Sequence, residues 1–414
     1  MTDKLKEYIQ KVIIRQKYLK DLENFCFAPF IKIIVGARRV GKSFYLFSII
    51  KKLLELNKLK ENQIFYINKE WLEYDDIQDY KDLNNYFLKW KKENKVGNNF
   101  FLGIDEVQEI KDWQKFILSI WSSYPQSIIF ITGSNSKLLS KDIGTNLRGR
   151  YISKKIFPLS LNEFSLFSNK NIDNELLFEY INYGGLPAIN FIDDLNIKLE
   201  YLKGVYNTIF VKDLLEYENI RNTNLLKNIH KFLFKEFGNL INSKNISNFL
   251  KKENIKTSIE TILNYMEFSF NSFLFDEVSR YDIRGKKLFE ITKKIYSFDL
   301  GIRNSIVGIN LQNDIGGIYE NLVYNHFISN GFNVFVGILG EKEIDFIAEK
   351  SGKKIYIQVA YLLSDEKVID REFGNLMKIK DGWEKIVISS DNLFVNNYEG
   401  IKHYNILDWL QNME

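Results

Sequence analysis

One eight-residue motif limits the fold of this chain more than any other feature of its sequence. The segment Gly36-Ala37-Arg38-Arg39-Val40-Gly41-Lys42-Ser43 matches the pattern G-x-x-x-x-G-K-[ST]. The apolar segment 31–36 predicts a strand at its start, and a helix is expected from about Ser43 to Leu56. Such a loop surrounds phosphate groups with backbone N–H groups at the positive end of a helix dipole. Residues 36–44, including Phe44, are therefore predicted to bind a nucleotide, with Lys42 on the phosphates and Ser43 on Mg²⁺.

A second motif predicts the catalytic carboxylates. The apolar segment 99–105 ends in Asp105, and Glu106 follows it directly. One carboxylate at such a strand end can bind Mg²⁺, and a second can activate a water molecule for attack on a phosphate. We assign Asp105 to the metal and Glu106 to the general base.

The next apolar segment, 127–133, predicts a strand with a polar end formed by Ser134 and Asn135. A polar side chain there can contact the γ-phosphate or hold the attacking water, and Asn135 is the preferred candidate. The alternative is that these residues cap a short helix.

Arginine usage points to further site residues. Only ten of the 57 Lys and Arg residues are Arg, so the positions that use Arg indicate a need for its planar fork. We predict that Arg148 and Arg150 neutralise transition-state charge, within the chain or across a subunit interface. A structural salt bridge is the alternative. Arg38 and Arg39 belong to the predicted nucleotide site, although side chains at such loop positions usually point outward.

Strands that alternate with helices over the first half of the chain predict a parallel α/β sheet covered by helices on both faces. The 414 residues are enough for roughly two to four domains. With 45% hydrophobic and 27% charged residues, the composition excludes a disordered or fibrous chain. No segment approaches the roughly 18 apolar residues of a membrane helix. The charged start does not match a signal peptide, and Cys26 is the single cysteine, so we expect a cytoplasmic protein.

Five segments in this order and spacing, GARRVGKS, FLGIDEVQEI, ITGSNSKLLS, LRGRY and FPLSLNEF, resemble the prokaryotic AAA-type ATPases with a C-terminal domain of unknown function. The later segments YGGLP and SRY…SFDLGIRN extend this resemblance over nearly the whole chain. It implies ATP as the ligand of an AAA+/STAND-like P-loop module, followed by a winged helix and a restriction-endonuclease-like domain. We accordingly predict an ATPase core at 1–160, a helical extension at 161–220, a winged-helix domain at 221–303 and an endonuclease-like domain at 304–414.

The middle of the chain is basic. Residues 221–303 carry 15 Lys or Arg and 9 Asp or Glu, a net charge of +6. Two amphipathic helices and two β-rich segments predict a winged helix, whose wing carries Arg280, Arg284, Lys286 and Lys287. These cations are expected to contact DNA phosphates. The alternative is a winged helix that docks on a protein.

The tail is acidic, with 10 Lys or Arg and 16 Asp or Glu in residues 304–414. The endonuclease pattern requires an Asp followed by Glu-x-Lys, and Glu320 and Asp345 are its candidate carboxylates. Gln358 and Ala360 stand where the Glu and the Lys should be. We therefore expect no phosphodiester cleavage unless a displaced lysine, such as Lys378, replaces the missing one.

The leading hypothesis is an Mg²⁺-dependent ATPase that acts as a molecular switch. A homo-oligomer is a candidate assembly, and no membrane partner is expected. The alternatives are an ATP-gated nuclease and a module that binds nucleotide without hydrolysing it. The intact Lys42, Asp105 and Glu106 favour the ATPase.

Overall fold

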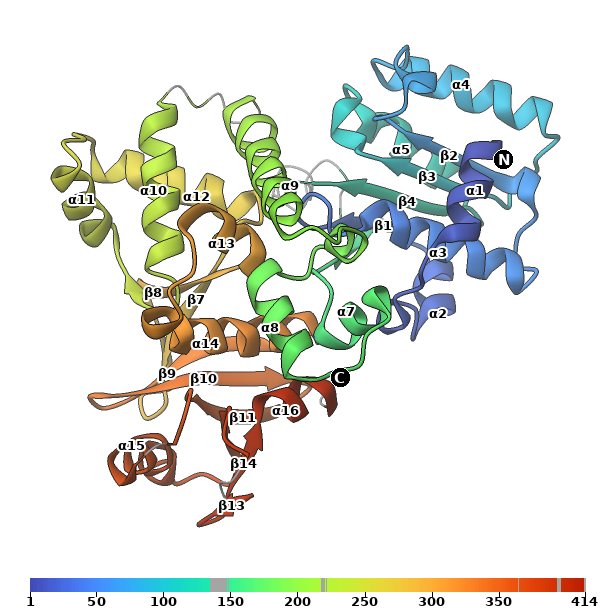
Figure 1. Cartoon of the computed structure of the whole chain (residues 1–414). Coiled ribbons are helices and arrows are strands. Elements are labelled where there is room, and N and C mark those ends of the chain that lie inside the picture. Colours follow the sequence, from blue (N-terminus) through green and yellow to red (C-terminus); the bar gives the residue numbers. More distant parts are fainter. Residues whose placement is uncertain are drawn as a thin grey trace. The chain divides into compact units, whose positions relative to one another are not determined.

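The computed structural model of the chain describes residues 1–134, 147, 149–216, 220, 222–363, 365–392 and 396–412. They form two compact units, Met1–Phe157 and Pro158–Glu414 (Figure 1). Within the described residues, no helix is both long enough and apolar enough to cross a membrane.

Unit 1 is built around a parallel sheet whose described strands follow the spatial order β2-β3-β4-β1-β5. Every residue of the first four strands along the chain is buried, as expected from their apolar sequences. The strands are β1 (Ile31–Val35), β2 (Ile64–Asn68), β3 (Phe101–Asp105), β4 (Ile128–Gly133) and β5 (Tyr151–Lys155).

Helices cover both faces of this sheet, which confirms the predicted α/β fold class. The step from β1 to β2 runs in the opposite direction to the steps from β2 to β3 and from β3 to β4. Because such crossovers are right-handed, the first connecting helix covers one face and the next two cover the other. Figure 1 shows α3 with α1 and α2 on one side and α4 with α5 on the other. These helices are α1 (Asp3–Lys11), α2 (Leu22–Phe27), α3 (Lys42–Glu55), α4 (Tyr80–Glu93) and α5 (Trp113–Ser123).

Unit 2 begins with a helical segment in which Gly184 and Gly185 pack closely against Asp299. Asp299 accepts hydrogen bonds from the backbone N–H groups of Gly185 and Ile302. Gly184 has a φ of 73°, and a Cβ atom there would lie 2.2 Å from Asp299 Oδ1, so a larger residue would be strained and would displace the Asp299 carboxylate. The helices of this unit up to its large sheet are α7 (Leu161–Ser168), α8 (Asn174–Tyr183), α9 (Leu195–Thr208), a π-helix (Ile209–Glu216), α10 (Thr223–Lys235), α11 (Ser243–Lys252) and α12 (Ile259–Asn271).

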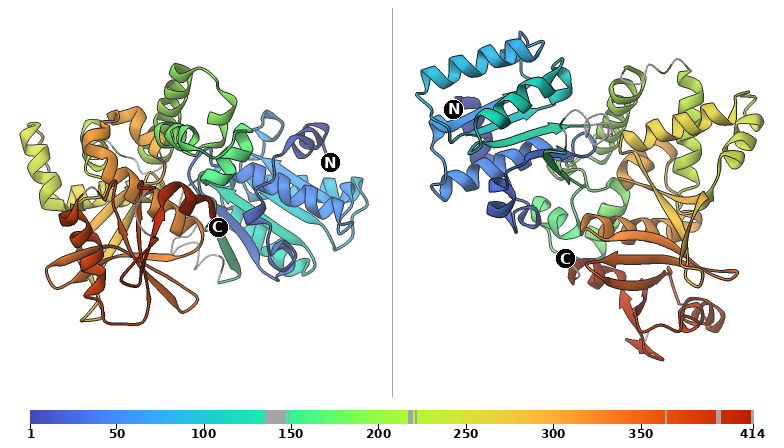
Figure 2. Two further views of the ribbon diagram at one scale, coloured as in Figure 1. Left: turned by 60° about the horizontal axis from the view of Figure 1, so that its bottom comes forward. Right: turned by 180° about the vertical axis from the view of Figure 1, so that it is seen from behind.

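One continuous sheet runs through the rest of unit 2, whose strands are coloured from yellow to red in Figure 2. Its described strands follow the order β13-β14-β12-β11-β10-β9-β7-β8-β6. The strands are β6 (Leu240–Ile241), β7 (Phe275–Asp282), β8 (Lys287–Ser297), β9 (Asn333–Leu339), β10 (Lys342–Lys350), β11 (Lys353–Val359), β12 (Glu384–Ser389), β13 (Asn397–Tyr398) and β14 (Ile401–Asn405). Helices α13 (Leu300–Val307), α14 (Leu311–Ser329), α15 (Glu366–Met377) and α16 (Ile406–Asn412) complete the unit.

The hairpin β7–β8 and the strands that follow residue 304 belong to this single sheet. Strand β7 pairs in parallel with β9, with Arg280 opposite Val336. The backbone N–H of Ile283, at the hairpin turn, also donates to Ile338 O at 2.9 Å. The wing and the tail, predicted as separate domains, are therefore joined by backbone hydrogen bonds, and the domain boundaries themselves stay a prediction.

Candidate functional site

The loop between β1 and α3 has the backbone geometry that its glycines predict. Gly36 and Gly41 have φ angles of 149° and 97°, in the region that favours glycine. A Cβ atom on Gly36 would lie 2.4 Å from Ile156 O. Helix α3 begins at Lys42, directly after this turn, so its N-terminal N–H groups lie at the loop.

Lys42 is buried inside this loop. Its Nζ donates to the carbonyl oxygens of Gly36 and Ala37, both at 3.0 Å. It also lies 3.9 Å from Glu106 Oε1, so the loop and the end of β3 meet at one point. This is the carboxyl edge of the sheet, where Asp105 ends its strand.

Asp105 lies at the centre of a buried polar cluster. Ser43 and Thr132 hydrogen-bond to its carboxylate, as do Tyr66 Oη at 3.0 Å and Asn68 Nδ2 at 3.1 Å. Burial and the neighbouring Glu106 charge raise the Asp105 pKa, although the hydrogen bonds from Ser43, Thr132 and Tyr66 oppose the shift. The hydroxyl of Ser43 and the carboxylate of Asp105 are therefore adjacent oxygen ligands suited to Mg²⁺.

Glu106 is held in a strained position beside Asp105. Its φ of 54° is left-handed, which is uncommon for a residue other than glycine, and its N–H donates to Thr132 Oγ1 at 3.2 Å. Burial alone would raise the Glu106 pKa. Lys42, the hydrogen bond from Gln108, and Arg38 more than offset burial and lower that pKa below its usual value. Glu106 is thus a charged, fixed carboxylate.

Of the site residues predicted to follow β4, the structure shows Ser134 at the site. Ser134 is buried and hydrogen-bonds to Glu106, so the end of β4 does reach the site. Asn135, the preferred candidate, and Arg148 lie outside the described residues.

Arg150 is not brought to this site within its own chain. It precedes β5, and its carbonyl oxygen accepts from the N–H of Ile31, the first residue of β1. Its guanidinium lies 4.8 Å from the ring centroid of Trp121, whose indole N–H donates to Pro29 O at 3.2 Å. These contacts lie at the amino edge of the parallel sheet, whereas the loop lies at the carboxyl edge. The structure therefore places Arg150 away from the loop of its own chain, and its predicted action on the transition state, within the chain or across a subunit interface, stays a prediction.

The remaining loop residues divide into buried and exposed ones. Val40 is buried, and its carbonyl oxygen accepts from Arg15 Nη1 at 3.2 Å. Arg39 is exposed, as expected for its position. Arg38 is not, because only 12% of its side chain is accessible to solvent. Phe44 is 47% exposed and packs edge-on against Tyr8.

Four residues that surround the site were missed by the sequence analysis, namely Arg15, Tyr66, Asn68 and Thr132. Asn68 and Thr132 are polar residues at the ends of apolar strands, and the carboxyl ends of parallel strands share one edge, so their positions could have been predicted. Arg15 is one of the ten arginines but stands far from any motif.

A second polar cluster forms in unit 2, around Lys294 on β8. The Lys294 Nζ lies 2.9 Å from Glu320 Oε2, 2.9 Å from Glu343 Oε1 and 4.0 Å from Asp345 Oδ1. Tyr296 Oη also donates to Glu320 at 2.8 Å. The two predicted carboxylates therefore do meet, but they surround a buried lysine that the sequence analysis did not select.

Gln358 is fully engaged beside this cluster. Its Oε1 accepts from the Asp345 N–H at 2.7 Å, and its Nε2 donates to Glu372 Oε2 at 2.7 Å. Lys378, the lysine suggested as a replacement, is exposed at the end of α15. Among the described residues, no group of three His, Cys, Asp or Glu side chains is arranged to hold a metal ion.

The predicted wing is only partly a free surface. Arg284, Lys286 and Lys287 are exposed at or beside the turn between β7 and β8. Arg280 is half-buried within the sheet, and its guanidinium lies 5.8 Å from the Phe289 ring centroid. Three of the four predicted cations therefore form an exposed basic turn.

Comparison with known proteins agrees with the geometry of unit 1. Residues 28–165 match the model of an AAA domain, and residues 174–313 match a domain of unknown function. An uncharacterized protein of Haemophilus influenzae is 36% identical over 96% of this chain and 98% of its own length. One of Methanocaldococcus jannaschii is 35% identical over 91% of this chain and 88% of its own length. Among solved structures, the chain is similar to the ORC2 protein of Aeropyrum pernix, with a TM-score of 0.41 and 10% identity, covering 73% of this chain and 93% of that one.

Proposed function

This chain, with its AAA domain, belongs to one family with the Haemophilus influenzae and Methanocaldococcus jannaschii proteins, and we propose that it is an Mg²⁺-dependent ATPase that acts as a molecular switch. The observation that carries the proposal is the meeting of Lys42, Asp105 and Glu106 at the carboxyl edge of one sheet, with Nζ of Lys42 only 3.9 Å from Glu106. Phosphate-binding loop, metal carboxylate and general base are then within reach of one nucleotide.

The roles follow from the contacts of each side chain. The α3 N-terminus and Lys42 bind the β- and γ-phosphates, because both present positive charge to the loop. Ser43 and Asp105 would hold Mg²⁺, because their oxygen atoms are ligands that this ion prefers. When bound, the ion would supply positive charge that stabilises the negative charge of the phosphates. Glu106 is charged at neutral pH and accepts a proton from the attacking water.

Two substitutions test this assignment. Lys42→Ala removes the cation of the loop and is expected to abolish ATP binding in a fluorescent-nucleotide titration. Glu106→Gln keeps the shape of the side chain and is expected to bind ATP but lose hydrolysis. Lys115→Ala, an exposed lysine on α5, serves as the control and keeps the wild-type rate. Equal ATPase rates for all four proteins would disprove the proposal.

A partner of the switch is proposed to bind the basic turn of unit 2. The order α10, β6, α11, α12 and hairpin β7–β8, with β6 paired to β8, supports the winged-helix prediction. The exposed Arg284, Lys286 and Lys287 suit DNA phosphates. Helix α12 carries Glu260 and Glu267 and no cation, which argues against recognition of a specific base sequence and leaves a protein partner as the alternative. A homo-oligomer and a cytoplasmic location complete this proposal.

An ATP-gated nuclease is the second candidate, because Lys294 lies beside Asp345 and provides a displaced lysine. Two observations weigh against it. Lys294 already neutralises Glu320 and Glu343, and both polar atoms of Gln358 are engaged within the protein. We expect no cleavage of plasmid DNA by the full chain with Mg²⁺ or Mn²⁺, with or without ATP. Cleavage that Asp345→Ala removes would establish the nuclease instead.

A further inference from the structure

Gln108 has a side-chain oxygen that the contacts of the site do not explain. The glutamine lies on the 3-10 turn Val107–Glu109 that follows β3, and the buried side chains of Val107 and Ile110 anchor this turn. Gln108 Nε2 donates to Glu106 Oε2 at 2.5 Å. Gln108 Oε1 is buried and accepts no hydrogen bond from the described residues. Because a buried acceptor without a partner costs free energy, this atom calls for a functional explanation.

The charge of Glu106 fixes which end of the Gln108 amide faces it. Although burial raises the pKa of Glu106, Lys42 and the hydrogen bond from Gln108 lower it overall, so the carboxylate is charged. A carboxylate without a proton can only accept hydrogen bonds. The amide must therefore present its NH₂ group to Glu106, and its oxygen is left as an acceptor beside the general base.

One water molecule can reach both Glu106 and the Gln108 oxygen. The oxygen and nitrogen of a carboxamide are about 2.3 Å apart, so Gln108 Oε1 lies no more than about 4.8 Å from Glu106 Oε2. A water whose hydrogen bonds measure about 2.8 Å can connect two atoms up to about 5.6 Å apart. The second carboxylate oxygen, Glu106 Oε1, lies 3.9 Å from Nζ of Lys42, the cation of the phosphate-binding loop. The Glu106 carboxylate thus faces Gln108 with one oxygen and Lys42 with the other.

Attack on a phosphate is faster when both hydrogens of the water have an acceptor. Glu106 accepts one hydrogen as the general base, but rotation about that single hydrogen bond leaves the direction of the oxygen lone pair undefined. A second acceptor fixes this direction, and correct orientation of the attacking atom contributes strongly to rate. The contact with Glu106 uses only the NH₂ group of Gln108, so its oxygen is available for this role.

We propose that Gln108 orients the attacking water of this ATPase together with Glu106. The inference rests on the proposed ATPase function. One O–H group of the water donates to Glu106, and the other donates to Gln108 Oε1. The water oxygen bonds to the γ-phosphorus while the bond from that phosphorus to the β,γ-bridging oxygen breaks. The first proton passes to Glu106, the second stays on the released phosphate, and ADP and phosphate leave.

The test uses the full-length protein with Gln108→Met, Gln108→Ala and, as the control, Gln312→Met, which changes an exposed glutamine on α14. Turnover is measured by phosphate release. Affinity is measured by titration of labelled ADP with Mg²⁺, with and without aluminium fluoride, which together with ADP mimics the phosphate under attack. For both Gln108 variants we expect ADP affinity and the KM for ATP within about threefold of wild type and kcat lower by about 10²-fold. The gain in affinity from aluminium fluoride should fall by about tenfold or more. Gln312→Met should match wild type.

A double variant separates contact with the water from support of Glu106. In Glu106→Gln protein, the added change Gln108→Met should lower the gain from aluminium fluoride by a further factor of about three or more, because Gln108 Oε1 still accepts from the water there. Equal gains in Glu106→Gln and the double variant would limit Gln108 to holding Glu106, and the inference would fall.

The outcomes separate this inference from the ATPase proposal. If Lys42→Ala abolishes hydrolysis while both Gln108 variants keep kcat within about threefold of wild type, the ATPase stands and the inference on Gln108 falls. If the Gln108 variants lose ADP affinity and melting temperature together with turnover, Gln108 is structural and the inference also falls. If the wild-type protein neither binds nor hydrolyses nucleotide, both proposals fall.

Discussion

At the scale of single residues, buried charges in this protein are tolerated because each has partners. Asp105 accepts hydrogen bonds from four side chains, and Lys42 binds two carbonyl oxygens and lies near Glu106. An unpartnered charge at either position would cost several kcal/mol. Away from the site, His230 is fully buried, its two ring nitrogens hydrogen-bond with Tyr206 and Ser269, and burial lowers its pKa.

His230 predicts how the stability of unit 2 depends on pH. Burial lowers the pKa of His230 to about 3, against 6.5 in the unfolded chain. The unfolded state therefore binds more protons below pH 6.5, so His230 makes stability fall from pH 6.5 toward pH 3. From pH 7.5 to 5.5 we expect a loss of about 1.4 kcal/mol from this residue. Urea unfolding at both pH values measures it. His230→Gln should be less stable at pH 7.5 but lose about 1.4 kcal/mol less on acidification, and an equal loss in both proteins would contradict the prediction.

At the scale of elements, strand β8 carries neighbouring lysines with different partners on its two faces. Side chains alternate between the faces of a strand, so Lys293 points outward to Glu277 while Lys294 points into the acidic cluster. Lys294 thereby ties β8 to Glu320 on α14 and to Glu343 and Asp345 on β10. The predicted wing and the predicted endonuclease-like tail are joined by this ion-pair network as well as by the shared sheet.

Substitution of Lys293 and Lys294 should change the stability of unit 2 by different amounts. Lys294→Met leaves three buried or half-buried carboxylates without their cation, and such a loss costs about 3–5 kcal/mol. Lys293→Met on the neighbouring position removes a more exposed pair and should cost no more than about 1 kcal/mol. Chemical denaturation of both variants provides the measurement. Similar penalties for the two variants would show that the Lys294 network does not stabilise unit 2.

The basic turn of the β7–β8 hairpin leads to a separate prediction about DNA binding. Replacing Arg284, Lys286 and Lys287 with Ala should weaken DNA binding by a similar factor for all sequences. Each lost phosphate contact should also reduce the slope of log affinity against log salt by about 0.9. Fluorescence anisotropy at several salt concentrations gives both quantities. The matched control replaces Lys367, Lys378 and Lys380, three exposed lysines on or near α15. Equal losses of DNA affinity in the two triple variants would show that the basic turn does not contact DNA.

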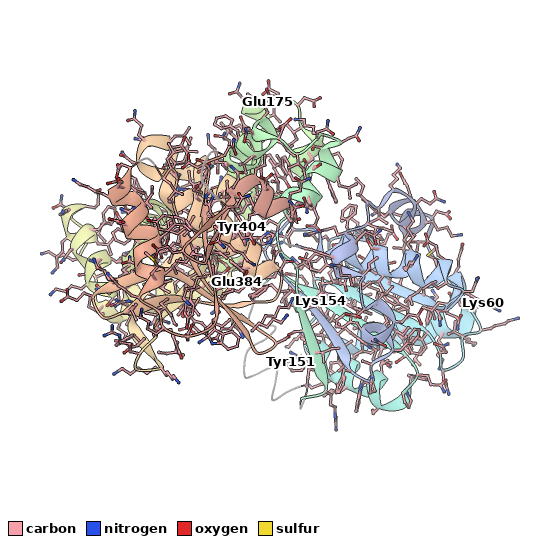
Figure 3. All side chains as sticks on the ribbon, turned by 90° about the horizontal axis from the view of Figure 1, so that it is seen from below. Lys60, Tyr151, Lys154, Glu175, Glu384 and Tyr404 are labelled. Atoms are coloured by element: carbon pink, nitrogen blue, oxygen red, sulfur yellow. The ribbon has the colours of Figure 1, made fainter. Side chains whose placement is uncertain are left out.

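At the scale of the whole molecule, the parallel sheet of unit 1 has two edges with different contents. The carboxyl edge holds the loop, Asp105 and Glu106, and the amino edge holds Arg150. Strand β5, which carries Tyr151 and Lys154 (Figure 3), leads away from that amino edge in parallel with β1. This placement favours action of Arg150 on the nucleotide of another copy of the chain, and the alternative is a scaffold role around Trp121.

A mixing experiment decides between these two roles of Arg150. If Arg150 acts on a second copy, Arg150→Ala should bind ATP within about tenfold of wild type and lose turnover. Mixing it with Glu106→Gln protein should then restore some hydrolysis, because one intact site forms at the shared interface. Activity per molecule should also rise with protein concentration. A lower melting temperature with unchanged turnover, and no recovery on mixing, would assign Arg150 to the scaffold alone.

The sequence by itself determined the features that depend on local chemistry. The glycine positions, the apolar strands and the carboxylates at the end of β3 follow from residue type and spacing, and the structure has the loop, strand and helix where they were expected. Only the tertiary structure decided which distant residues share a site. Strand order brought Tyr66 and Thr132 to Asp105, and the parallel direction of β5 beside β1 placed Arg150 at the sheet edge opposite the loop. Sheet pairing between β7 and β9 joined two predicted domains, and Lys294 reached Asp345 through it. Backbone pairing between remote strands leaves little trace in local sequence, because it depends on register and topology and not on residue type.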